Sequence, residues 1–274
     1  MPSWQPWGRV GAALLVLAAL AGVGAGVSLH RPSRPATPAQ AKASLARGAA
    51  WVWPASNGPK PDAAGAAPYL EAAVLLESLT LRAETVEHGG RNDPLSLPAG
   101  ARLLPVIHVE AAADAPDAFT AGQTEAIVAA VLRHADEAAR GAGVLQLDFE
   151  APARELPAYR ALVSQVRHAL PPKVRLSVTA LAHWCFQGDW LDTLAADEVV
   201  PMLFHLGSQP QAWLQRFARD EAAMARCCRG PALGFATNDP PPIALLAHAS
   251  HPYWFDEGAW SNPSHPPRYL WPRP

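Results

Sequence analysis

The chain has 274 residues, of which 50% are hydrophobic and 17% charged, and its formal net charge is −2. This hydrophobic content excludes a disordered chain and is enough to bury the core of one domain. Because the net charge is small and no basic stripe with interleaved aromatic residues occurs, we expect no nucleic acid partner.

The chain begins with an uncharged apolar segment, which runs from Val10 to Leu29 after a short opening that carries Arg9. About 20 apolar residues can cross a bilayer as a helix, and a basic opening before them is typical of an export signal. We therefore interpret residues 1–29 as a signal peptide or a transmembrane anchor. The protein is predicted to be exported to the periplasmic or extracellular face, with membrane contact through this segment only.

Residues 30–48 are rich in Pro, Ala and Arg, a composition that favours a linker over a folded part. Residues 49–274 are predicted to form the folded domain.

Eight short apolar runs in this domain have the character of β-strands. They cover residues 50–54, 73–82, 102–110, 143–150, 174–181, 198–205, 231–237 and 252–255.

Two helical patterns lie between these runs. The first begins with a capping box of Thr120 and Gln123 and ends at Gly141, and the second begins at Pro157. Strands that alternate with helices indicate parallel βαβ units. The fold class is therefore predicted to be α/β, a (β/α)8 TIM-like barrel. Because residues 55–72 and 83–101 have weak helix signals, we expect the barrel to be irregular.

The fourth predicted strand ends in the sequence VLQLDFE, with two carboxylates two residues apart. Side chains alternate between the two faces of a strand, so Asp148 and Glu150 share a face with Gln146. In a barrel, Leu145 and Leu147 would pack under the helices and the carboxylates would point inward.

Polar side chains also occur at the ends of other predicted strands, where barrel enzymes have their active sites. They are His108, Glu110, Thr179, His183, His205 and Asp239. The structural alternative is that each of them caps a helix or forms a turn.

Paired carboxylates at this position suit glycoside hydrolysis, which needs an acid to protonate the leaving oxygen. Glu150 is the predicted proton donor and Asp148 its partner. The expected ligand is a carbohydrate, because Trp51, Trp53 and Trp184 are placed to stack on sugar rings around the mouth. A glycan-binding module without catalysis and a structural envelope protein are the alternatives.

The three cysteines, Cys185, Cys227 and Cys228, have no metal-ligand spacing. We expect no metal and no cofactor. In an exported domain, Cys185 is predicted to form a disulfide with Cys227 or Cys228; three free thiols are the alternative.

The LDFE ending is similar to the D-x-E strand ending of chitinase-like barrels (glycoside hydrolase family 18). There the Glu is the general acid and the Asp orients the substrate's N-acetyl group, which is what the resemblance implies for Glu150 and Asp148. Met202-Leu203-Phe204 occupies the place of an M-x-Y-like strand end, with Phe204 in place of Tyr. Gly143 and Gln146 replace two earlier Asp residues of that family's pattern.

A resemblance over nearly the whole domain is to a bacterial family, domain of unknown function 3142. It is carried by LQLDFEAPARELPAYRALVSQVRHALP, LSVTALAHWC, VVPMLFHLG, LGFATNDPP and YWFDEGAW. The family pattern has Asp at the position of Glu150 and usually Arg at that of His205. This resemblance implies an exported barrel of unestablished activity.

Overall fold

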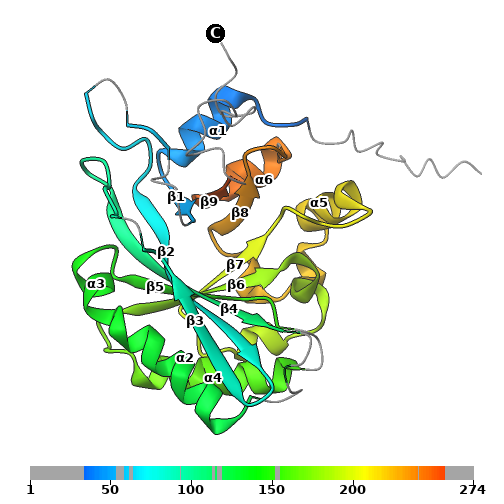
Figure 1. Cartoon of the computed structure of the whole chain (residues 1–274). Helices are drawn as coiled ribbons and strands as arrows, with labels where there is room; N and C mark the ends of the chain where they lie inside the picture. The colour runs from blue at the N-terminus through cyan, green and yellow to red at the C-terminus, as the bar shows by residue number, and fades with distance from the viewer. Residues whose placement is uncertain are drawn as a thin grey trace, which may run out of the picture. The chain divides into compact units, whose positions relative to one another are not determined.

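Eight parallel strands form a closed barrel in the computed structural model of the protein (Figure 1). The structure describes residues 34–53, 59–61, 64–92, 94–112, 115, 119–151, 155–239 and 241–256. The barrel strands are β1 (Ala49–Val52), β2 (Glu71–Arg82), β4 (Arg102–Ala111), β5 (Val144–Phe149), β6 (Arg175–Leu181), β7 (Glu198–Met202), β8 (Ala232–Ala236) and β9 (His251–Phe255). Each overlaps one predicted strand, and β1 closes the ring by pairing in parallel with both β2 and β9. The predicted barrel is confirmed.

The helical layer is incomplete, as the weak helix signals predicted. Among the described residues between β2 and β4 there is no helix; β3 (Thr85–Gly90) forms an antiparallel hairpin with β2 instead. The other elements are α1 (Pro38–Leu45), α2 (Ala121–Arg133), α3 (Ala135–Arg140), α4 (Leu156–Ala169), η2 (Ala182–Phe186), η3 (Trp190–Thr193), α5 (Pro210–Arg219), η4 (Glu221–Ala223), η5 (Arg226–Arg229) and α6 (Ile243–His248), where η marks a 3₁₀-helix.

The first predicted helix is present but broken into α2 and α3 at His134. The side chain of Thr120 accepts a hydrogen bond from the backbone of Gln123, and the Gln123 side chain accepts one from the backbone of Thr120. This reciprocal capping starts the helix where the sequence predicts it. The second predicted helix, α4, buries Tyr159 and Leu162 with other apolar side chains of one face.

The side chains of β5 alternate between two clusters, as expected. Leu145 and Leu147 belong to the outer core between barrel and helices. Val144 belongs to a second cluster inside the barrel, and Gln146 and Asp148, which share its parity, are buried with it. The strand therefore presents Asp148 to the lumen.

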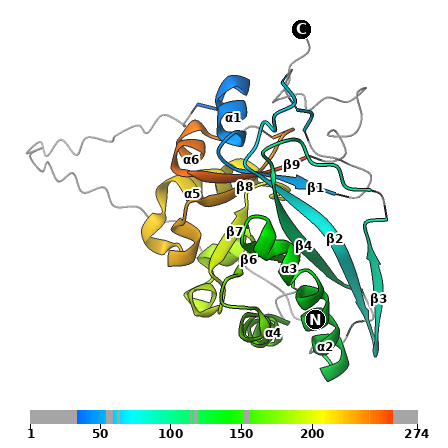
Figure 2. The same ribbon diagram turned by 90° about the vertical axis from the view of Figure 1, so that its left-hand side faces the viewer.

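Residues 34–48, expected to be part of a linker, belong instead to the compact unit that contains the barrel. Thr37 and Gln40 form a capping box that starts α1, and Leu45 is fully buried. Ser44 accepts a hydrogen bond of 3.0 Å from the indole of Trp254 in β9. Figure 1 and Figure 2 show α1 beside α6, where it acts as a wall helix of the barrel. The linker prediction is wrong for this stretch because its small residues pack closely against β9.

None of the helices within the described ranges has the length and hydrophobicity to cross a membrane. The predicted segment of residues 1–29 lies outside those ranges.

A disulfide joins Cys185 to Cys228, one of the two predicted pairings, and Cys227 remains a thiol. Both bonded cysteines are buried in the outer core. Asp192 accepts a hydrogen bond of 2.8 Å from the backbone N–H of Cys227. Burial and the Asp192 carboxylate together raise the pKa of the Cys227 thiol to about 12.

Candidate active site

A cavity of about 180 Å³ lies at the carboxyl ends of the barrel strands. Its walls combine aromatic side chains with two carboxyl groups and two imidazoles. The lining residues are Trp51, Trp53, His108, Asp148, Glu150, Thr179, Met202, Phe204, His205 and Phe255. The barrel thus gathers residues that lie more than 200 positions apart in sequence, and most of them are predicted site residues.

Asp148 is held from both neighbouring strands. His108 is its register partner in β4, and the distance from His108 Nδ1 to Asp148 Oδ2 is 2.8 Å. From β6, Thr179 donates its hydroxyl proton to Asp148 Oδ1 at 2.6 Å. Each carboxylate oxygen therefore has one donor, which fixes the carboxylate plane in the lumen.

Glu150 lies one residue beyond the end of β5, at the mouth of the cavity, where its side chain remains exposed. Partial burial and the nearby charge of Asp148 raise the pKa of Glu150, whereas His108 and His205 lower it. The result is a carboxyl group with a raised pKa, which is the property expected of a general acid.

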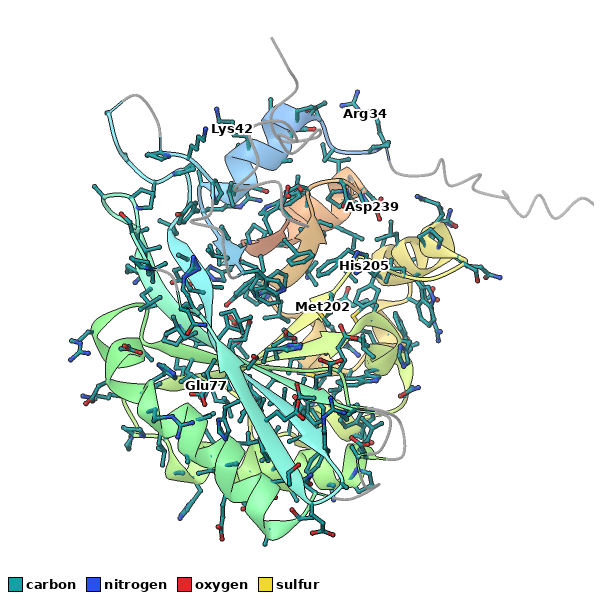
Figure 3. The ribbon with its side chains drawn as sticks, in the orientation of Figure 1. Arg34, Lys42, Glu77, Met202, His205 and Asp239 are labelled. Atoms are coloured by element: carbon teal, nitrogen blue, oxygen red, sulfur yellow. A yellow bond between two sulfur atoms is a disulfide. The ribbon has the colours of Figure 1, made fainter. Side chains whose placement is uncertain are left out.

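His205 follows the end of β7 with a left-handed backbone, φ 52°, which is uncommon for a residue other than glycine. This conformation turns the chain so that His205 lines the cavity. Figure 3 shows Met202, His205 and Asp239 in sequence along this side of the barrel. Burial raises the pKa of Asp239, and His205 lowers it. Asp239 faces His205 from outside the cavity lining.

Aromatic rings form much of the cavity wall. The ring centroids of Phe204 and Phe255 are 5.4 Å apart in a stacked arrangement, and Trp53 meets Phe255 at 5.6 Å. Trp51 is only 3% exposed and packs deeper in the lumen. Phe204 and Phe255 were missed as site residues, although each stands at the end of a predicted strand, which was the available signal.

Besides Asp239, three predicted site residues lie outside the cavity lining. Trp184 is 1% exposed and packs against Tyr159 and Trp190 in the outer core. Its predicted place at the mouth is wrong, because the chain turns into η2 after β6 and carries the indole behind the barrel wall. His183 packs beside Trp213. Glu110 is exposed at the end of β4, although its charge reaches His108.

No family model and no curated protein matches the chain. The resemblance to the domain of unknown function 3142 family thus gains no support from those comparisons. Among solved structures, the chain is similar to the crystal structure of the Bacillus cereus spore cortex-lytic enzyme SleL, with 13% identity and a TM-score of 0.43. The match covers 74% of this chain and 58% of that chain. A likeness this distant carries no argument about function.

Below the cavity, a network of hydrogen bonds fills the lumen. Gln146 accepts from the indole of Trp51 at 2.6 Å and donates to Ser177 at 3.2 Å. Glu198 accepts from Ser177 at 2.9 Å and from the hydroxyl of Tyr253 at 2.8 Å. Burial and the charge of Glu198 raise the pKa of Tyr253 well above its usual range. No local pattern in the sequence predicts this network.

A second cavity of about 150 Å³ lies outside the barrel between α5 and α6. Its lining is mostly apolar and comprises Phe217, Ala218, Glu221, Met224, Cys228, Arg229, Leu233, Ala244, Leu245 and His248. Within the described ranges, no group of three or more His, Cys, Asp or Glu side chains is arranged to hold a metal ion.

Proposed function

We propose that this protein is a glycoside hydrolase-like enzyme that acts on an envelope or extracellular glycan, with Glu150 as proton donor and Asp148 as its partner. The proposal rests on the two carboxyl groups of Glu150 and Asp148 and on how they are placed. A carboxyl group with a raised pKa stands at the mouth of a cavity, next to a second carboxylate that two neighbouring strands hold in place.

The arrangement suits the demands of glycosidic bond cleavage. As the bond between the anomeric carbon and the leaving oxygen breaks, the Glu150 carboxyl gives its proton to that oxygen. Positive charge then develops on the sugar ring, and the fixed negative charge of Asp148 stabilises it. Water supplies the hydroxyl group of the product and restores the proton to Glu150.

The aromatic side chains of the cavity suit the apolar face of a sugar ring. A pyranose ring presents C–H groups on its faces, and the rings of Trp53 and Phe255, which meet edge to face, supply apolar surface in the cavity that Asp148 and Glu150 also line. A cavity with one apolar wall and a few convergent polar groups is typical of small-ligand sites.

Export is part of the proposal. A buried disulfide between Cys185 and Cys228 is typical of oxidising compartments, in agreement with the export segment predicted at residues 1–29.

A glycan-binding module without catalysis is the second candidate. It is favoured by one feature of Asp148, which is that both carboxylate oxygens are already engaged by protein donors. Such a carboxylate can serve to hold the mouth together without taking part in a reaction.

The deciding experiment is an assay of Glu150→Gln on a panel of glycans of which the wild type cleaves at least one. The substitution keeps the size of the side chain and removes the proton, so turnover is expected to fall by about 10²–10⁴-fold. Glu110→Gln is the matched comparison, because Glu110 lies one residue before the end of the neighbouring strand β4 and does not line the cavity. It acts on the site only through the charge of His108, so turnover should change far less than in Glu150→Gln. Wild-type turnover in Glu150→Gln contradicts the proposal. Binding of several glycans with cleavage of none favours the binding module.

A further inference from the structure

His108 lies among the charged groups of the site. Its Nδ1 atom is 2.8 Å from Asp148, and three carboxyl groups act on its charge: Asp148, Glu110 and Glu150. Its side chain is 31% exposed, on the side that lines the cavity.

The barrel itself builds the contact between His108 and Asp148. The two residues are register partners in adjacent parallel strands, so their side chains leave the sheet side by side toward the lumen. Thr179 completes the arrangement from the strand on the other side. Asp148 is thus fixed by one donor that can carry a positive charge and by one that is neutral.

We propose that His108 is the positioning residue of this site: its ring N–H holds Asp148, and its positive charge acts on the Glu150 carboxyl in the cavity that both residues line. The effect of His108 on the titration of Glu150 does not depend on the proposed function; its effect on glycan cleavage does.

The charges that face His108 favour its protonated form. Burial opposes the positive charge, but the hydrogen bond to Asp148 and the negative charges of Asp148, Glu110 and Glu150 outweigh it and raise the pKa of His108. The uncharged ring of Trp53, which follows β1, lies with its centroid 6.3 Å from that of His108.

The sign of the effect on Glu150 follows from these charges. The positive charge of His108, together with that of His205, stabilises the ionised form of Glu150 and lowers its pKa, while burial and Asp148 raise it. If the charge on His108 is removed and Asp148 stays in place, Glu150 should keep its proton to a higher pH.

The test is an NMR titration of the Glu150 carboxyl carbon in protein labelled with ¹³C at glutamate, assigned by comparison with Glu150→Gln. In His108→Asn, the amide nitrogen takes the place of Nδ1 and can still donate to Asp148, but the charge is gone. The pKa of Glu150 should rise by roughly 0.5–1, at the low end of the effect of a neighbouring charge because Glu150 is exposed. Where glycan cleavage is measurable, the alkaline limb of the pH profile should shift by the same amount.

Thr179→Val is the matched control, since it removes the other hydrogen bond to Asp148 and no charge. An unchanged Glu150 titration in His108→Asn overturns the inference, and so does an equal rise in Thr179→Val.

If His108→Asn does not fold, ¹⁵N titration of the wild-type imidazole decides. Protonation of His108 that persists above pH ~6.5, the ordinary midpoint of histidine, supports the inference, and a neutral ring below it contradicts the inference. Because these titrations use no glycan, their outcome is separate from that of the cleavage assay.

Discussion

Both ends of the barrel lumen contain glutamate side chains, but within the described part of the chain only those at one end are hydrogen-bonded to the protein. At the floor, the amino ends of the strands, Glu198 accepts hydrogen bonds from both Ser177 and Tyr253. At the mouth, the carboxyl ends, Glu150 lines an open cavity, and none of the described residues forms a hydrogen bond with its carboxyl group. Floor carboxylates are thus engaged by the protein, whereas a mouth carboxyl is left for a ligand.

This difference suggests that the floor of the lumen serves the stability of the fold and that the mouth serves the chemistry. A buried polar group costs free energy unless it is hydrogen-bonded, so the floor must pair its groups internally. An exposed acid at the mouth carries a smaller penalty, and the fixed charge beneath it can still raise its pKa. Substitutions at the two ends should therefore change different measurements.

The largest contrast is expected from Asp148→Asn beside Glu198→Gln. Asp148→Asn removes the charge that faces both His108 and Glu150, so turnover should fall at least about tenfold while the barrel stays folded. Glu198→Gln alters the floor and should leave turnover close to that of the wild type. Initial rates and circular dichroism melts of both variants test this. Full turnover in Asp148→Asn together with reduced turnover in Glu198→Gln would mean that the floor, and not the mouth, serves catalysis.

A smaller effect, on stability alone, is expected from Glu198→Ala. The buried hydroxyl of Tyr253 then loses its acceptor, which should lower the free energy of unfolding by about 1–3 kcal/mol. Glu150→Ala, an exposed substitution at the mouth, should change it by about 0.5 kcal/mol or less.

Urea denaturation measures both values. Adding Tyr253→Phe to Glu198→Ala removes the unpaired hydroxyl and should restore part of the loss. If the double variant is no more stable than Glu198→Ala, the floor hydrogen bond is not what stabilises this end.

The barrel and the position of its carboxylates could be predicted from sequence because they depend on local patterns. Apolar runs bounded by turn residues located all eight barrel strands, though not the hairpin strand β3, and the alternation in VLQLDFE placed Asp148 in the lumen. The two helices with clear capping or proline signals were located for the same reason.

What escaped prediction depends on contacts between distant residues. The Glu198–Tyr253 bond joins positions 55 apart, and neither residue shows a local sign of its partner. Trp184 was misplaced because its position depends on how η2 turns after β6. Helix α1 was missed since its core contact uses Ser44 and small residues in place of an apolar stripe. Its only signal was the capping box of Thr37 and Gln40, hidden in a stretch of linker-like composition.

The smallest expected effect is a pH dependence of stability that belongs to the floor. His251, at the start of β9, lies 3.3 Å from Glu71, the first residue of β2. Burial opposes the positive charge of His251 and Arg102 adds to the opposition, but the hydrogen bond to Glu71 and the charges of Glu71 and Glu198 outweigh both and raise the pKa of His251.

A raised pKa in the folded state means that the protonated pair stabilises the fold fully below the unfolded pKa of about 6.5, and that this stabilisation is lost as the pH rises through the folded pKa. The wild type should therefore have a Tm advantage over His251→Gln that shrinks by roughly 2–4 °C, the equivalent of 1 kcal/mol in a domain of this size, between pH 5.5 and pH 9. The change with pH is the quantity to measure, because His251→Gln also removes the contact of the imidazole with Tyr253, a loss that persists at every pH. In a Glu71→Gln background the same comparison should show less pH dependence, since the main negative partner is gone. A Tm difference that stays constant across the range would mean that His251 does not couple the floor to pH.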